Sequence, residues 1–196
     1  MAAVSHRERV LRAATSAFLA DGYRASVERI ARRAGVAKQT VYSHFPSKDE
    51  LFKEVTRGLT TRVLVQLESE PGDLRASLLR FAVAYRSRVL SSEGIAMFRT
   101  LLSEIPRFRS LARAVYEGGT GLTARALAAH LKKAMDAGFL RKEDPQFAAE
   151  LFISMLVGVD RTKRLYGMSR SGGNDAHRAA RIVDCFMRTY STEGHS

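Results

Sequence analysis

The sequence lacks the features of disulfide-bonded, membrane-spanning and secreted proteins. Its 196 residues include one cysteine, Cys185, so no internal disulfide can form. We expect Cys185 to be a small buried apolar side chain rather than a reactive thiol. No apolar run reaches the roughly 18 residues that a transmembrane helix needs, and the polar N-terminus does not resemble a signal peptide. We therefore expect a cytoplasmic protein that folds without disulfides or metals.

The sequence also lacks the motifs of common enzyme sites. It has no Gly-rich phosphate loop, no HExxH pair, no Cys-rich metal spacing and no Gly-x-Ser-x-Gly elbow. Its five histidines are scattered, and no two of them lie at ligand spacing on one helix. We expect no catalytic residues, no metal and no cofactor, so a small helical enzyme is the least favoured function.

Negative charge is in short supply. The chain has 32 Lys and Arg against 20 Asp and Glu, a net charge of +12, which favours a polyanionic partner. The first 60 residues hold 11 of the basic and 6 of the acidic residues, so the excess is not confined to them. Charge alone leaves open an architectural nucleic-acid binder, which would show strong salt dependence and little sequence preference.

Apolar residues recur at three- and four-residue spacing along almost the whole chain, which predicts an all-α fold. Capping signals and glycine or proline breaks divide this pattern into separate helices. The sequence predicts an N-terminal helix-turn-helix domain over residues 1–50 and a C-terminal helical domain over residues 51–196. A long helix that starts at Ser47 is expected to join the two domains.

The stretch from Ser26 to Leu51 predicts two short helices around a turn at Gly35. The second short helix, from about Ala37 to Ser43, presents a polar face that is rich in hydrogen-bond donors. A polar helix on an apolar base is suited to reading DNA in the major groove. The polar side chains on and directly after this helix are Lys38, Gln39, Thr40, Tyr42 and His44.

These side chains differ in what they can contact on a duplex. Gln39 can pair with adenine N6 and N7, or with a phosphate. Lys38 can reach a guanine or a phosphate. The hydroxyl groups of Thr40 and Tyr42 suit phosphate oxygens, which set the register of binding without reading sequence. His44 can also reach the phosphate backbone.

Lys48 lies in the first turn of the next helix, where a cation opposes the helix dipole. A phosphate bound there would be held by both the ammonium and the exposed helix amides, whereas the alternative is a solvated lysine. Ser26 is expected to cap the preceding helix. The complete set of candidate DNA-binding residues is Ser26, Lys38, Gln39, Thr40, Tyr42, His44 and Lys48.

The run IARRAGVAKQTVYSHFPSKDELF resembles the DNA-binding domain of the tetracycline-repressor (TetR) family of transcriptional regulators. Many members have glycine where this chain has Gln39, and a tyrosine is often found in place of His44. The resemblance covers residues 5–60, and residues 97–166 resemble one common C-terminal subtype. The shared features are Ala34-Gly35-Val36 at the turn, Thr40, Tyr42, Phe45 and the helix start Ser47-Lys48-Asp49-Glu50-Leu51.

The resemblance implies a homodimer with a C-terminal domain that responds to a small-molecule effector. It implies repression of transcription at a near-palindromic DNA operator, with activation as the alternative. By the same resemblance, Lys38 and Gln39 are the base readers. The residues expected to contact phosphates are Thr40, Tyr42, His44 and Lys48.

The last two predicted helices, over about residues 145–166 and 175–190, carry apolar stripes that suggest dimerisation. A helix that is apolar on both sides must be buried on both sides, one of which can meet a partner subunit. The alternative is that the core of one subunit covers everything. The predicted interface residues are Leu151, Met155, Gly158, Leu165, Ile182, Val183, Phe186 and Tyr190.

Aromatic and flexible apolar residues recur on several of the C-terminal helices. They could line a cavity for a small apolar or aromatic effector, although each alone is more simply explained as ordinary core. The candidate ligand-binding residues are Phe81, Tyr85, Met97, Phe98, Leu102, Phe108, Tyr116, Phe152 and Met155.

Overall fold

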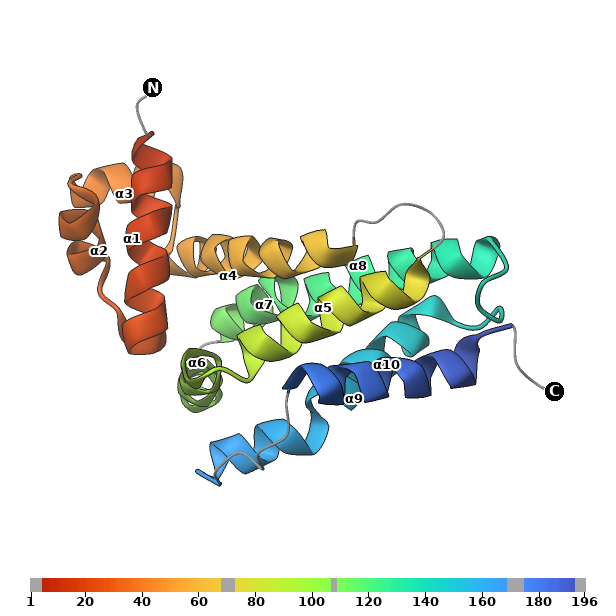
Figure 1. Ribbon diagram of the computed structural model, residues 1–196. Helices are drawn as coiled ribbons and strands as arrows, with labels where there is room; N and C mark the ends of the chain where they lie inside the picture. Colours follow the sequence, from red (N-terminus) through yellow and green to blue (C-terminus); the bar gives the residue numbers. More distant parts are fainter. Residues whose placement is uncertain (1–4, 68–72, 107–108, 169–174, 193–196) are drawn as a thin grey trace. The chain divides into compact units, whose positions relative to one another are not determined.

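The computed structural model describes residues 5–67, 73–106, 109–168 and 175–192, which form α-helices α1 to α10 and two short 3-10 segments (Figure 1). The all-α prediction is confirmed: the only β contact in these described ranges is an isolated bridge between Leu140 and Ser191. Packing divides the chain into two compact units, one formed by Met1–Thr60 with Ser92–Thr120 and the other by Thr61–Ser91 with Gly121–Ser196.

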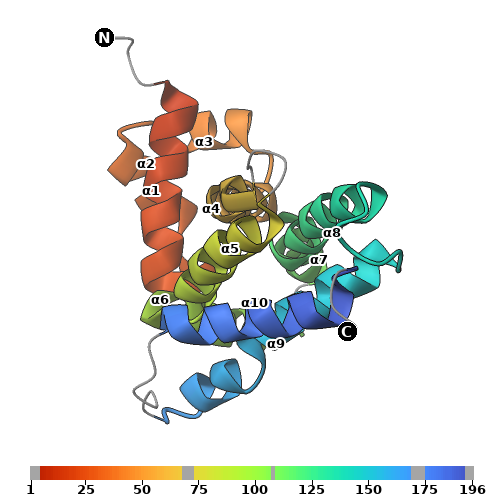
Figure 2. The same ribbon diagram turned by 45° about the vertical axis from the view of Figure 1, so that its right-hand side comes forward.

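The first unit contains the predicted helix-turn-helix together with two later helices. α1 packs against both short helices α2 and α3, as Figures 1 and 2 show. The helices of this unit are α1 (His6–Asp21), α2 (Val27–Ala34), α3 (Lys38–His44), α4 (Lys48–Leu64), α6 (Ser92–Glu104) and α7 (Arg109–Gly118), with a 3-10 turn at Gly22–Arg24.

Capping residues that the sequence predicts set the ends of these helices. Ser5 and Glu8 form a reciprocal capping box at the start of α1. The Ser26 hydroxyl accepts a hydrogen bond from the Arg29 amide at 3.2 Å and so starts α2. Gly35 ends α2 with φ 64°, in the left-handed region that side chains other than glycine rarely adopt. The turn between α2 and α3 therefore depends on glycine at this position.

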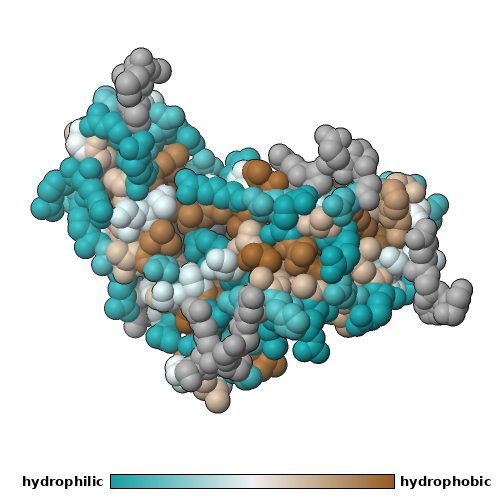
Figure 3. Space-filling view, viewed as in Figure 1, coloured by the Kyte–Doolittle hydropathy of each residue, from teal (hydrophilic) through white to brown (hydrophobic). Residues whose placement is uncertain are grey.

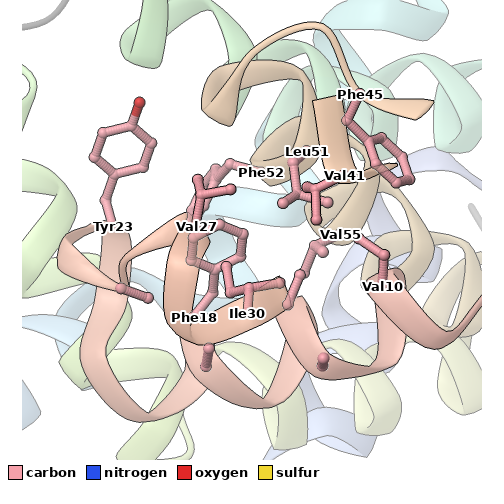
Figure 4. Packing of buried hydrophobic residues seen from close by; sticks show 14 of the residues in the cluster. Val10, Phe18, Tyr23, Val27, Ile30, Val41, Phe45, Leu51, Phe52 and Val55 are labelled. Carbon is pink, nitrogen blue, oxygen red and sulfur yellow. The ribbon is translucent and has the colours of Figure 1, made fainter. Parts of the chain in front are cut away.

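One hydrophobic core joins the helices of the first unit (Figure 4). Phe18 of α1 and Phe52 of α4 meet edge to face, with ring centroids 4.9 Å apart. Val41 of α3 and Phe45, which follows it, are buried in the same core. The short helix α3 thus owes its position to tertiary packing, because seven residues are too few for an isolated helix in water.

The end of α7 lies against the backbone of α4. The Thr60 hydroxyl donates a hydrogen bond to the Gly118 carbonyl at 2.9 Å. A Cβ atom at Gly118 would come within 2.8 Å of the Lys53 carbonyl oxygen, so a side chain there would force the helices apart. Glu117 and Lys53 form an ion pair at 2.9 Å beside this contact. This close approach ties α7 to the first unit, and α6 belongs to it through its contacts with α1 and with the 3-10 turn at Gly22–Arg24.

The second unit is built around α5 and α10, which pack along each other, with α9 in contact with both. Its core contains a row of aromatic rings in which Phe152 lies 6.4 Å from Phe81 and 4.7 Å from Phe186. The helices are α5 (Leu74–Val89), α8 (Thr120–Asp136), α9 (Pro145–Leu165) and α10 (Asp175–Tyr190), and a 3-10 segment, Val65–Leu67, extends α4.

The prediction that Cys185 is buried is wrong, because the structure exposes it on α10. The buried stripe of this helix is formed by Ala179, Val183, Phe186 and Tyr190. Cys185 is two residues from Val183, which places it on the opposite side of a helix with 3.6 residues per turn.

α9 bends at Gly158, where φ 11° and ψ −120° interrupt the helix. A helix break leaves carbonyl oxygens without their usual amide partners. The buried Arg86 of α5 supplies a donor at this break, because its Nη1 donates a hydrogen bond to the Leu156 carbonyl. Its Nη2 atom binds Asp160 of α9 at 2.9 Å and Asp175 of α10 at 2.8 Å. One guanidinium therefore connects three helices at the bend.

The Arg86 network controls the charge of Asp175. Partial burial raises the pKa of this carboxyl, but hydrogen bonds and charge from Arg86 and Arg164 outweigh burial and hold the pKa below its ordinary value. A carboxyl whose pKa is lower in the folded state stabilises the fold above its unfolded pKa, and this contribution is lost as the pH falls.

We predict that Arg86→Met lowers the free energy of unfolding by about 3 kcal/mol, near the lower end for loss of one partner of a buried ion pair. Two carboxylates and the Leu156 carbonyl would lose their shared donor. Urea unfolding at neutral pH measures the effect. The difference between wild type and variant should narrow below about pH 4, where Asp175 becomes protonated in the unfolded chain.

Arg75→Met is the matched control, because Arg75 forms an exposed pair with Asp184 at 2.7 Å on the same two helices, α5 and α10. Loss of an exposed pair should cost less than about 1 kcal/mol. Equal stability losses in the two variants would contradict the role assigned to Arg86.

Candidate nucleic-acid interface

The outer face of α3 is mostly polar because Val41, its one aliphatic residue, is buried in the core. Val41 is 1% exposed and Phe45 2% exposed, and both point toward α1 and α4 (Figure 4). The other side chains of the helix are left on the outside, and the surface over α1 to α3 is mostly hydrophilic in the view of Figure 3. Lys38, Gln39, Tyr42 and His44 are exposed, and Thr40 is half-buried.

Arg9 of α1 fixes the turn that precedes α3. Its guanidinium donates to the Ala34 carbonyl from Nε at 2.9 Å and from Nη2 at 2.6 Å, and to the Gly35 carbonyl at 2.7 Å. These carbonyls lie at the end of α2, where the helix has no further amides to offer them. The clamp holds the end of α2 and the turn that leads into α3 against α1, so this turn depends on a side chain outside the helix-turn-helix.

Lys38 opens α3 and forms an ion pair with Glu28 of α2. Its ammonium also lies 5.9 Å from the centroid of the Tyr42 ring. The hydrogen bond from Lys38 lowers the pKa of Glu28, and the same bond raises the pKa of Lys38. Both groups therefore stay charged at neutral pH, and a predicted base reader carries a negatively charged neighbour.

Lys48 is held against an aromatic ring. Its ammonium lies 4.4 Å from the centroid of the Tyr23 ring, within cation–π distance. The Tyr23 hydroxyl donates a hydrogen bond to Asp49. The pKa of Tyr23 is raised, first by burial and second by the Asp49 carboxylate. The Ser47 hydroxyl accepts from the Glu50 amide at 3.1 Å and so caps the start of α4. Lys48 thus has a defined position beside the first turn of α4.

The structure brings the seven candidate DNA-binding residues onto three neighbouring helix segments. Ser26 lies at the start of α2 with its side-chain oxygen occupied by the capping hydrogen bond. Lys38 to His44 lie on α3, and Lys48 lies on the first turn of α4. The sequence predicts which residues form this face. It did not predict the contacts made by Arg9, Glu28 and Tyr23, because the spacing of residues along the chain does not show which distant groups meet.

The comparisons with known proteins agree with this geometry. Residues 10–55 match the family described as "Bacterial regulatory proteins, tetR family". Residues 76–192, more than half of the chain, match "AefR-like transcriptional repressor, C-terminal domain". The chain belongs to the TetR family of transcriptional regulators. It is therefore a DNA-binding regulator, and its family is not one of enzymes.

Solved structures of the family resemble the chain over nearly its full length. One, the Flavonoid-responsive Regulator FrrA, is 30% identical, with a TM-score of 0.72 over 96% of this chain and 98% of that one. A TetR family regulator from Pseudomonas syringae pv. tomato is 25% identical, with a TM-score of 0.67 over 95% and 97%. A TetR regulator from Agrobacterium tumefaciens shares the fold, at 22% identity and a TM-score of 0.76 over 97% of each chain. No curated protein sequence matches the chain.

Among the residues that the structure describes, no three His, Cys, Asp or Glu side chains come together in a way that could hold a metal ion. None of the helices described is both long enough and apolar enough to span a membrane.

The nine candidate effector residues occupy different surroundings. Phe81, Tyr85 and Phe152 are buried in the aromatic row of the second unit, where Phe81 and Tyr85 stack at 5.5 Å. Met155 is half-buried in that unit. The first unit contains the half-buried Met97 and Phe98 and the exposed Leu102 and Tyr116, while Phe108 lies outside the described residues. Effector binding by these residues stays a prediction.

The predicted dimer residues also divide by burial. Val183, Phe186 and Tyr190 are already covered within their own unit. Leu151 and Gly158 are exposed, whereas Met155, Leu165 and Ile182 are half-buried. The side chains still available for a partner therefore lie mainly on the outer side of α9, where Phe147 is 60% and Val159 64% exposed.

We predict that Lys48→Ala weakens binding to all duplex sequences alike and reduces the salt slope of the logarithm of the affinity by about one unit, as expected for one lost phosphate contact. Binding is measured by fluorescence anisotropy at several salt concentrations. Lys132→Ala is a suitable control, because Lys132 is an exposed lysine of α8 paired with Asp136. An unchanged slope in the Lys48 variant would remove this residue from the phosphate contacts.

Proposed function

We propose that the protein is a sequence-specific transcriptional repressor that binds a near-palindromic operator as a homodimer and is released by a small molecule. The observation that carries this proposal is α3, a helix whose apolar side is fixed in a core and whose exposed side offers polar donors. A helix held in this way can enter the major groove without losing its support.

The division of contacts follows from side-chain chemistry. Lys38 and Gln39 open α3 and read bases, because the first residues of a recognition helix reach deepest into the groove. The phosphate contacts are made by Thr40, Tyr42, His44 and Lys48, while Ser26 caps α2 at the edge of this surface. Residues 1–50 form the DNA-binding domain, and residues 51–196 carry effector binding and dimerisation. The protein acts in the cytoplasm, where its DNA target is accessible.

The dimer forms through the outer side of α9 together with α10. Phe147, Leu151 and Val159 are large apolar side chains that remain exposed on α9, and burying them against a second copy would remove apolar area from water. In such a dimer the two copies of α3 enter successive major grooves, about 34 Å apart, on one side of the duplex.

The effector is a small apolar or aromatic molecule. Two observations support this class: the second unit is rich in aromatic rings, and the Flavonoid-responsive Regulator FrrA is 30% identical over nearly the whole chain. To release the operator almost completely, the effector must bind the DNA-free conformation more tightly by several kcal/mol. The long helix α4, which carries Lys48 at one end, transmits the change to the DNA-binding residues.

The central test selects bound fragments from random duplex DNA and repeats the binding with flavonoids added. We expect enrichment of one near-palindromic sequence and loss of binding when an active flavonoid is present. Binding to all sequences alike, with steep salt dependence, would instead support the architectural nucleic-acid binder. Selection of an operator that no aromatic molecule releases would leave the regulator without the proposed effector class.

We predict that Gln39→Ala weakens operator binding by about 1–3 kcal/mol and relaxes preference at one or two base pairs, because a bidentate contact to one base is lost. The measurement is the affinity for the selected operator and for a set of single-base variants. Ser43→Ala, at an exposed position on the same helix, is the control. If the affinity falls equally for every sequence, Gln39 contacts the backbone and does not read a base.

A further inference from the structure

The ion pair between Lys38 and Glu28 places a carboxylate within the proposed DNA-contacting surface. Lys38 is the first residue of α3, and Glu28 is the second residue of α2. Both side chains are about half exposed, at 51% for Lys38 and 58% for Glu28, so neither is hidden from an approaching duplex. The pair therefore forms where the protein is expected to meet a polyanion.

The two groups restrain each other. At neutral pH both are charged, because the hydrogen bond between them lowers the pKa of Glu28 and raises the pKa of Lys38. Exposed pairs of this kind contribute little to stability, so the fold does not depend on this carboxylate. Its main consequence is for Lys38, whose ammonium must share or give up its contact with Glu28 when it contacts DNA.

We propose that Glu28 is a specificity-determining residue that makes Lys38 unavailable to ordinary phosphates and available to the correct base. This inference rests on the proposed function, because it assigns Lys38 to base reading. A phosphate offers one charged contact in exchange for the Glu28 carboxylate. A guanine in the major groove offers two acceptors, O6 and N7, and is held in place by all other contacts of the bound complex.

Glu28 thus weakens binding to unrelated DNA more than binding to the operator. The biologically relevant quantity for a regulator is the ratio of these affinities, since unrelated sites vastly outnumber the operator. Two other carboxylates of the same domain have partners outside the candidate set: Asp21 pairs with Arg29, and Asp49 accepts from Tyr23. Glu28 differs from them because its partner is a predicted base reader.

The test compares wild type, Glu28→Gln, Lys38→Gln and the double variant on the selected operator and on an unrelated duplex. With Glu28→Gln we expect affinity for the unrelated duplex to rise about fivefold at 0.15 M salt, as for one additional neutralised phosphate, and the salt slope to steepen by about 0.9. Affinity for the operator should change less than about twofold, so discrimination falls.

The double variant identifies the cause. If Glu28 acts mainly by holding Lys38, the change Glu28→Gln has a much smaller effect on unrelated DNA once Lys38 is glutamine. If Glu28 acted only by repelling phosphates, the same change would increase affinity at least as much in the Lys38→Gln background, because Glu28 would then be unpaired. That second result would overturn the inference.

Glu117→Gln is the matched control. It makes the same carboxylate-to-amide change in the same unit, at a side chain that also pairs with a lysine, Lys53, at 2.9 Å but lies on α7. This variant should leave the affinity ratio between the two duplexes unchanged. An equal loss of discrimination in both variants would show an effect of net charge and would also overturn the inference.

The outcomes separate this inference from the proposed function. A wild-type protein that prefers no sequence would overturn the proposed function, and the specificity role of Glu28 with it. A wild-type protein that selects an operator while Glu28→Gln binds both duplexes as before would overturn only the inference. Thermal unfolding of the variants should match wild type, because the pair is exposed.

Discussion

The burial of Val41 and Phe45 is the constraint on which the proposed DNA-binding surface depends. These two side chains fasten a seven-residue helix to the aromatic core formed by Phe18 and Phe52. Such a short helix has no stability of its own, so its orientation is that of the core beneath it. The polar side chains of α3 face outward because Val41 holds the opposite side of the helix in this core.

The surface formed by α2, α3 and the start of α4 carries acidic as well as basic side chains. The chain has a net charge of +12, yet the carboxylates of Glu28, Asp49 and Asp21 lie among the cations of α2, α3 and α4. A purely basic surface would bind any duplex and read none. Glu28 and Asp21 each hold one cation, Lys38 and Arg29, in a defined position, whereas Asp49 accepts from the neutral Tyr23 hydroxyl.

The sequence predicts the features that depend on neighbouring residues. The caps at Ser5 and Ser26, the turn at Gly35 and the polar face of α3 all follow from local spacing, and the structure confirms the caps and the turn. The sequence could not predict contacts between distant segments, such as the Arg9 clamp on the turn or the guanidinium of Arg86 at the α9 bend. For the same reason, hydrophobic periodicity did not show that Val183, Phe186 and Tyr190 of α10 would be buried within their own unit.

The first unit is discontinuous in the chain, which leaves it after Thr60 and returns to it at Ser92. Gly118 packs closely against the backbone of α4, and this contact holds the returning segment in the first unit. Consider a hybrid regulator in which only residues 1–60 are fused to a foreign sensor domain. In that protein α4 would lose its contact with α7 at Gly118. The transplanted piece must therefore include the returning segment, Ser92–Thr120, with its helices α6 and α7.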